Sequence, residues 1–340
     1  MTQDPCDSGH VPDLRVPTTR SAGPSPRTAR LGHRRNALLA LSLLAVTTNV
    51  ALASGNVTVE RTASTWRIRG DDLANAIVIE PLTNATIRIR GSSTRGNTTV
   101  NRRAFVDIDT SLPIRIEMRG GDDSVLVRGT SSRPLNLSAL TCDLGAGVDT
   151  LQVSYAKLRG RLTIDAGDGS ATGPIGYETI TLQNCEMSDL DFDTDRRAGS
   201  NSLSVSICTI RGSVRIDGSD GTNSVQMSST RIDGSLAVDL HDESNASLMS
   251  DSLSLTSMNV GRAVSIDLGR GRSTTNLSSI TAGAVSIDIG DYANDQIIVR
   301  NARFPSLRVR DHGGSRDRIS GTGNRIGSIR LIGVEVNQLR

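Results

Sequence analysis

The sequence predicts an all-β protein that folds as a right-handed parallel β-helix, or β-solenoid, with about 22 residues per coil. Three observations predict this fold: a short strand pattern recurs along most of the chain, glycine-rich turns bound each occurrence, and aromatic residues make up only 2% of the 340 residues. A core built on large aromatic side chains is therefore excluded. A narrow stack of Val, Ile, Leu and small residues fits the composition instead.

The repeated element is a strand of the form apolar-x-apolar-Asp, as in Leu162–Asp165. From Asp143 to Ile332 the steps between equivalent positions are 22, 28, 24, 22, 28, 21, 22 and 22 residues. The terminal acids are expected to stack as a column along one corner of the solenoid. These acids are Asp143, Asp165, Asp193, Asp217, Asp239, Asp267 and Asp288.

Each repeat has the same internal order. A glycine precedes the strand, a glycine-rich turn ending in Asp or Asn follows it, and then come a second apolar-x-apolar strand and an isolated apolar position. Alternation with period two predicts strands, and three apolar faces per repeat predict three strands and three corners per coil. Parallel crossovers are nearly always right-handed, which gives the expected hand. The residues after position 53 would make about 12 such coils.

The predicted organisation has three parts: residues 1–53 as an N-terminal extension and signal peptide, 54–113 as an irregular β cap or first coils, and 114–340 as solenoid repeats. In 54–113 the strand pairs lie about ten residues apart, which favours an antiparallel cap. In the leader, Arg34 and Arg35 precede ten mostly aliphatic residues, and Ala51-Leu52-Ala53 follows. This pattern predicts cleavage between Ala53 and Ser54.

We therefore expect an exported protein that is periplasmic, on the cell surface or extracellular. The apolar run is too short to span a bilayer, and no second long one follows, so no membrane span is expected after cleavage. Lys and Arg number 38 and Asp and Glu 36, and the basic excess lies in the leader. A general attraction to nucleic acid is therefore not indicated.

The repeats resemble those of exported bacterial β-solenoid proteins with units of the form V-x-I-D-x-G-x-G-x-D-x-V-x-V, most of which have no defined function. The resemblance extends over residues 114 to 340 and is best at 141 to 153 and at 116 to 127. It implies a role in the cell envelope or outside the cell.

Two interpretations of the acidic positions remain open. Each Asp in the column can cap its own turn by hydrogen bonding, as an Asx motif. Alternatively, residues 145 to 151 and 120 to 123 are similar to half of a calcium-binding nonapeptide, which makes Asp122, Asp123, Asp143 and Asp149 candidate calcium ligands. That family needs consecutive nine-residue repeats, whereas these recur at 22. No other cofactor is expected.

Cys142, Cys185 and Cys208 follow the leader, and this odd number excludes complete internal pairing. Cys185 and Cys208 precede strands in successive coils, so they would lie within disulfide range. A disulfide between them and a pair of stacked thiols are both compatible with the sequence.

The function expected from these features is that of a non-enzymatic structural, adhesive or interaction protein, with an envelope protein or a glycan as partner. End-to-end self-association through the apolar C-terminal coil is a further expectation, unless Arg330, Glu335 and Arg340 guard that end. The alternative is a carbohydrate-active β-helix enzyme, a polysaccharide lyase or hydrolase, with an acid pair from the column and Arg215, Arg308 or Arg310 as its basic partner. The insertions between repeats hold no aromatic subsite for a sugar.

Overall fold

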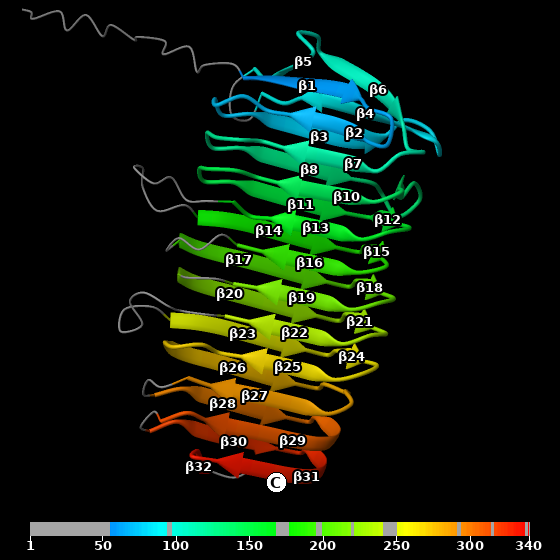
Figure 1. The fold of residues 1–340 in the computed structure, drawn as a ribbon. Coiled ribbons are helices and arrows are strands. Elements are labelled where there is room, and N and C mark those ends of the chain that lie inside the picture. The colour runs from blue at the N-terminus through cyan, green and yellow to red at the C-terminus, as the bar shows by residue number, and fades with distance from the viewer. Residues whose placement is uncertain are drawn as a thin grey trace, which may run out of the picture. The chain divides into compact units, whose positions relative to one another are not determined.

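The computed structural model describes residues 55–93, 97–167, 177–194, 199–218, 221–240, 250–290, 294–313, 316–336 and 339. The expected cleavage site at Ala53 and Ser54 lies outside these residues. Within them all regular structure is β, and the strands stack coil upon coil as a β-solenoid (Figure 1). The predicted fold class is therefore confirmed.

Three sheets run along the stack: two have 13 strands each, and the third has six. In spatial order the first sheet consists of β5 (Thr99–Val100), β1 (Asn56–Arg61), β2 (Trp66–Arg69), β7 (Ile114–Glu117), β10 (Leu140–Asp143), β13 (Leu162–Asp165), β16 (Leu190–Asp193), β19 (Val214–Asp217), β22 (Leu236–Asp239), β25 (Val264–Asp267), β27 (Val285–Ile289), β29 (Arg303–Asp311) and β31 (Arg325–Ile332).

The second sheet faces the first across the core, and the third closes the coil. The second consists of β6 (Phe105–Asp109), β4 (Thr86–Gly91), β3 (Ala76–Pro81), β8 (Ser124–Arg128), β11 (Thr150–Ser154), β14 (Tyr177–Gln183), β17 (Gly199–Ser206), β20 (Gly221–Ser228), β23 (Ser250–Thr256), β26 (Arg272–Ser278), β28 (Gln296–Arg300), β30 (Arg318–Thr322) and β32 (Glu335–Val336). The third consists of β9 (Leu135–Leu137), β12 (Ala156–Leu158), β15 (Glu186–Met187), β18 (Thr209–Ile210), β21 (Arg231–Ile232) and β24 (Asn259–Val260).

Strand pairing fixes the number of coils. From β7 to β31 the first sheet advances through nine parallel pairings, with Ile114 and Ile329 at the two ends of the series. The expectation of about 12 coils was wrong, because it divided all residues after the leader by one period. The described strands before β7 pair largely as antiparallel hairpins, and the steps from Leu162 to Leu190 and from Leu236 to Val264 are longer than one period.

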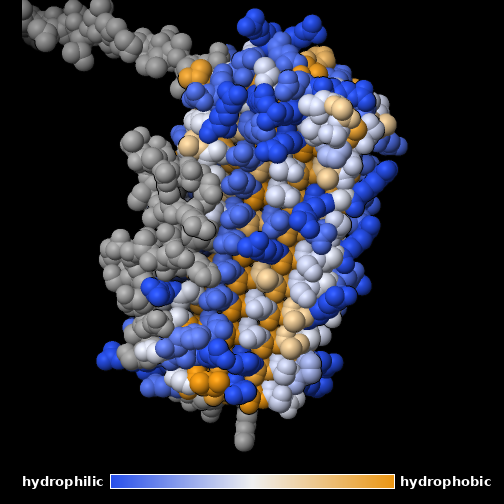
Figure 2. All heavy atoms as spheres, viewed as in Figure 1, coloured by the Kyte–Doolittle hydropathy of each residue, from blue (hydrophilic) through white to orange (hydrophobic). Residues whose placement is uncertain are grey.

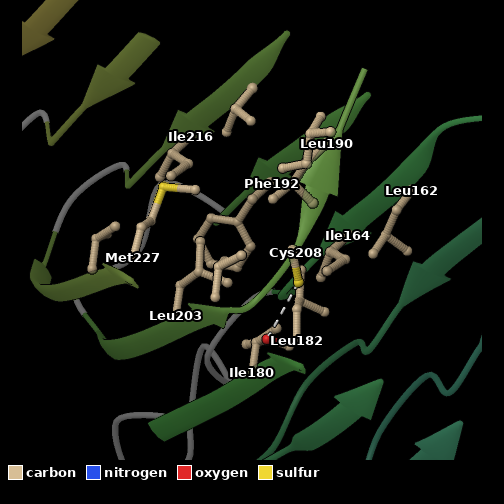
Figure 3. Close-up of a cluster of buried hydrophobic side chains, with 14 of the residues drawn as sticks. Leu162, Ile164, Ile180, Leu182, Leu190, Phe192, Leu203, Cys208, Ile216 and Met227 are labelled. Carbon is tan, nitrogen blue, oxygen red and sulfur yellow. Dashed lines mark hydrogen bonds between the residues drawn. The ribbon is translucent and has the colours of Figure 1, made fainter. Parts of the chain in front are cut away.

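The core is a narrow column of aliphatic side chains. Residues alternate inward and outward along each strand, as in β19, where Val214 and Ile216 are buried and Arg215 is exposed. Ile164, Phe192 and Ile216 are aligned in register on successive coils, and Figure 3 shows the Phe192 ring among aliphatic neighbours. One coil cannot bury this surface alone, so the stack depends on each neighbour for its core.

The N-terminal residues combine a cap with the start of the stack. β1 pairs with β2, β3 with β4, and β4 with β6, all antiparallel. β2 and β3 also pair in parallel with β7 and β8, so the hairpins supply the first layer of both large sheets. The partly buried Trp66 packs against the core at this end.

The corners of the coils use two different devices. Before the first-sheet strands, glycine allows close approach of neighbouring coils: a Cβ on Gly234 would lie 2.4 Å from the Gly212 carbonyl oxygen. Between the second and third sheets, one residue per coil takes a left-handed conformation, with φ between 49° and 56°. These residues are Tyr155, Asn184, Ile207, Ser229, Ser257, Ser279 and Asn301.

Candidate functional site

The corner between the first and second sheets carries an acidic residue on its outward side in eight consecutive coils. Direct pairing of the first-sheet strands places these residues one above another. We call this row the outer ladder, and it consists of Glu117, Asp143, Asp165, Asp193, Asp217, Asp239, Asp267 and Asp288. Seven of its members were expected from the repeat; Glu117 extends the row by one coil.

Charge repulsion along the outer ladder is offset locally at several coils. Asp165 accepts a hydrogen bond from the Gly167 amide at 3.0 Å, and Asp267 accepts one from Gly269 at 3.1 Å. These are the Asx-type turns that the sequence suggested. Three other members of the ladder have charged or ionisable partners instead.

Arg67, Arg69 and Arg115 converge on Glu117 at one end of the outer ladder. The hydrogen bond from Arg67 lowers the pKa of Glu117, although burial acts in the opposite direction. Farther along, Arg215 bonds Asp217 at 2.8 Å, and His312 Nε2 lies 2.7 Å from Asp288 Oδ1.

Asp143 and Asp193 are less well compensated. Burial, together with the charge of Asp165 and other neighbouring carboxylates, raises the pKa of both groups. Among the described residues neither of them forms an ion pair, and neither does Asp165. The charges of Arg115 and Arg215 act in the opposite direction on Asp143 and Asp193, respectively, but do not outweigh these effects.

A second row of polar residues lies on the inner side of the same corner, within the first three residues of the second-sheet strands or directly before them. All of its members are buried. We call it the inner ladder, and it consists of Asn75, Asp123, Asp149, Glu178, Asn201, Asn223, Asp251, Ser273, Asp295 and Asp317.

The inner ladder satisfies backbone amides that the corner leaves without a carbonyl partner. The Asn75 amide donates to Asp123 Oδ1 at 2.6 Å, and the Asp123 amide donates to Asp149 Oδ1 at 2.7 Å. The Asp295 amide donates to Asp317 Oδ1 at 2.8 Å in the same way. A buried amide without an acceptor is costly, so each carboxyl group stabilises the coil before its own.

Burial changes the ionisation of these carboxyl groups. It raises the pKa of Asp123 to about 8, against the opposing effect of the Asn75 hydrogen bond. It also raises the pKa of Glu178 and of Asp295 to about 7. In Asp123 and Asp295 the second carboxylate oxygen has no hydrogen-bond partner among the described residues, which fits a protonated group.

The candidate calcium ligands do not all belong to one ladder. Asp123 and Asp149 are successive members of the inner ladder, whereas Asp143 belongs to the outer ladder. Asp122 accepts a hydrogen bond from the Val148 amide at 3.1 Å. The described part of the chain contains no group of three His, Cys, Asp or Glu residues arranged to hold a metal ion.

The two neighbouring cysteines are stacked thiols in the structure. Cys185 and Cys208 are buried in register on adjacent coils, and the Cys185 amide donates to Cys208 Sγ at 3.4 Å. Both are free, as is Cys142. Hydrogen bonding to Cys185, together with burial, raises the pKa of the Cys208 thiol, and burial raises that of Cys142.

An open pocket of about 690 Å³ lies beside the cap and is lined by Glu80, Arg128 and Arg133 among others. Burial acts to raise the pKa of Glu80, but hydrogen bonds from Arg90 and Arg128 outweigh it and lower the pKa. A general acid in glycoside hydrolysis needs a raised pKa and a second carboxyl group nearby. Among the described residues that line the pocket, Glu80 is the one carboxylate.

Figure 2 shows columns of hydrophilic residues along the visible face, with a column of hydrophobic residues between them. The part of the chain that the structure describes holds no apolar helix long enough to cross a bilayer. Comparison of the chain with protein-family models, with curated proteins and with solved structures finds no match.

Proposed function

We propose that this chain is an exported, non-enzymatic structural or interaction protein that presents rows of charge in the cell envelope or outside the cell. The observation that carries the proposal is the outer ladder, in which eight successive coils place a carboxylate at the same outward corner. A row with one charge per coil suits contact with an extended or repetitive surface, because neighbouring charges recur about every 4.8 Å.

Export is supported by the arginine-flanked apolar run and by Ala51-Leu52-Ala53. The test is to express the full chain with its own leader in a bacterial host, to separate cytoplasmic from exported protein, and to sequence the N-terminus of each fraction. We expect exported protein that begins at Ser54. Recovery of cytoplasmic protein alone, still carrying residues 30 to 53, would contradict export.

The carbohydrate-active alternative predicts a different result in a glycan assay. We expect the purified chain to release no reducing ends from acidic or neutral polysaccharides, because the ladder carboxylates bond to turns, arginines and backbone amides. A glycan array measured in parallel reports binding without cleavage. Turnover that is lost in Asp165→Asn and Asp193→Asn would identify the outer ladder as an active site instead.

End-to-end association through β31 remains part of the proposal. Ile329 is 46% exposed, whereas Leu307, its partner in register on β29, is 1% exposed. An apolar strand edge of this kind can accept another strand. Contact there would be hydrophobic and therefore insensitive to salt, which distinguishes it from a contact made by charges.

A further inference from the structure

The outward side of the second sheet carries a regular array of uncharged polar side chains. The register of six successive strands, from β11 to β26, aligns three outward positions per strand into three columns. We call this surface the hydroxyl face. Its columns are Thr150, Thr179, Ser202, Ser224, Ser252 and Thr274; Gln152, Thr181, Ser204, Gln226, Ser254 and Asn276; and Ser154, Gln183, Ser206, Ser228, Thr256 and Ser278.

The hydroxyl face is free of charged side chains. An ordinary protein surface has about 25–35% charged residues, which would place about four to six on eighteen positions. Outward positions of the other two sheets carry charge in the same coils, as at Lys157, Asp191 and Arg215. Charge returns where the face ends, because Arg128 and Arg300 take the third column beyond β11 and β26. The uncharged surface therefore has defined limits.

The protein does not use these side chains for its own hydrogen bonds. In the cap, Thr62 and Thr83 accept hydrogen bonds from backbone amides of their own turns. By contrast, no side chain of the hydroxyl face forms a hydrogen bond with any residue that the structure describes. Asn276 Oδ1 lacks such a partner although the atom is buried. The donors and acceptors of this face are available to a ligand.

The hydroxyl face repeats in two directions. Neighbouring coils are about 4.8 Å apart, and outward residues along one strand recur about every 6.6 Å. Ser and Thr have few rotatable bonds, so a ligand fixes them at a small cost in conformational entropy. A charged partner would lose hydration here without gaining counter-charges. The face therefore suits an uncharged partner that presents donors and acceptors in a repeating pattern.

An exposed aromatic ring lies at the edge of the hydroxyl face. Tyr177 begins β14, two residues before Thr179 on the same side of the strand, and pairs in register with Ser200. It is 58% exposed. The sequence indicated no aromatic subsite in the insertions, but the pairing of β14 with β17 brings this ring to the face. An aromatic ring beside hydrogen-bonding groups can pack on the apolar side of a sugar ring while its neighbours bond the sugar hydroxyls.

We propose that the hydroxyl face binds the surface of an uncharged, ordered polysaccharide, with Tyr177 packing against a sugar ring at its margin. Hydroxyl groups on neighbouring rings and chains of such a polymer form a repeating pattern of donors and acceptors, so many weak contacts act together. Ice is the other uncharged lattice of this kind. Side-chain length varies along the middle column, from Ser204 to Gln226, which disfavours a fit to so rigid a lattice.

This inference goes beyond the charged outer ladder and depends neither on that ladder nor on export. The test measures depletion of the purified full chain by microcrystalline cellulose, chitin and insoluble β-1,3-glucan at low and high salt. Ser202→Lys with Ser224→Lys places two long side chains on adjacent strands of the face. A control, Ser265→Lys with Ser286→Lys, makes the same change at adjacent outward positions of the first sheet. Tyr177→Ala removes the ring alone, and melting curves establish that each variant is folded.

We expect the unaltered chain and the control to bind at least one of these polymers with similar affinity. Binding should be equal at low and high salt, because the contact contains no charges. The double-lysine variant of the face should bind about tenfold more weakly or worse, because the lysines hold the polymer away and lose hydration on contact. Tyr177→Ala should weaken binding by about threefold or more.

Three results would overturn the proposal. The first is no binding to any of the three polymers at high micromolar protein; if the chain then inhibits ice recrystallisation and the double-lysine variant of the face does not, the face binds ice instead. The second is polymer binding that the double-lysine variant retains. The third is binding that disappears in high salt, which would point to a contact made by charges. None of these results changes the N-terminal sequencing or the reducing-end assay, so the proposed function is judged separately.

Discussion

Asp143 and Asp149 lie six residues apart at one corner, the first in the outer ladder and the second in the inner ladder. The outer carboxyl group is partly exposed, and burial and the charges of its neighbours raise its pKa. The inner one is buried and accepts a hydrogen bond from a backbone amide. The comparison teaches that side chains of one kind, repeated at one period, can stabilise a solenoid on its inner side and charge its surface on the other. The two rows therefore respond differently to substitution, pH and metal ions.

Removing one carboxyl group from each ladder should give the largest difference between the ladders, measured as the loss in the free energy of unfolding. Asp123→Ala leaves the Asn75 amide buried without its acceptor and opens a small cavity, so we expect a loss of about 2–4 kcal/mol in the free energy of unfolding. Asp165→Ala removes only the turn hydrogen bond to Gly167, and we expect a loss of about 1 kcal/mol or less. Urea denaturation followed by circular dichroism measures both. Equal losses would contradict the distinction between the ladders.

Glu117 of the outer ladder should also differ from Asp123 and Asp295 of the inner ladder in the direction of its pH dependence. The folded pKa of Asp123 is about 8 and that of Asp295 about 7, above the value of about 4 in an unfolded chain. Their stabilising contribution is therefore complete below about pH 4 and is lost as pH rises through 7 to 8. Glu117, whose pKa is lowered, behaves oppositely: its contribution is present above the unfolded pKa and is lost in acid.

Asp295→Asn is the matched variant for this pH dependence, because asparagine already occupies the inner ladder at Asn201 and Asn223. The amide keeps an acceptor for the Ser273 amide but carries no charge at any pH. We expect it to raise the free energy of unfolding at pH 8 by on the order of 1–2 kcal/mol and to have little effect at pH 5. Melting temperatures measured from pH 4 to 9 give the comparison. A variant that is less stable than the parent at pH 8 would show that Asp295 is ionised and paired in the folded chain.

The smallest expected effect is that of calcium. Asp122, Asp123 and Asp149 already accept backbone amides, so an ion would have to displace those hydrogen bonds. We expect millimolar calcium to raise the melting temperature by about 1 °C or less relative to EDTA, by weak screening of the outer ladder. A rise of several degrees that Asp122→Asn abolishes would establish a specific site there instead.

The sequence predicts the outer ladder because its acids end a strand pattern that is easy to align. The inner ladder has no such alignment: the distance from the outer to the inner member is six residues at Asp143 and 13 at Asp165, and its members alternate among Asp, Asn, Glu and Ser. The sequence shows a turn that ends in Asp or Asn in each repeat. It does not show that this side chain points inward and is buried, because that depends on closure of the coil.

Other features depend on tertiary contact in the same way. Tyr155, Ile207 and Ser229 share a left-handed backbone conformation but no side-chain chemistry, so no residue pattern indicates that corner. Arg308 and Arg310 stood out as single basic residues, but only the register of β29 with β31 shows that Arg308 pairs with Arg330 and Arg310 with Ile332. The hairpins before β7 likewise have strand periodicity, and only pairing distinguishes a cap from a coil.

Because the chain returns to the same register after each coil, the length of the stack can change without a change in the structure of a single coil. Val214 and Leu236 occupy equivalent positions on successive coils, so residues 214–235 form one closed circuit. Deleting that circuit would bring Leu236 onto β16 in place of Val214 and shorten the stack by about 4.8 Å. Each ladder would lose one member, and the aliphatic column would remain continuous. Whole turns can therefore be gained or lost as units, and related chains of different length could keep the same cross-section.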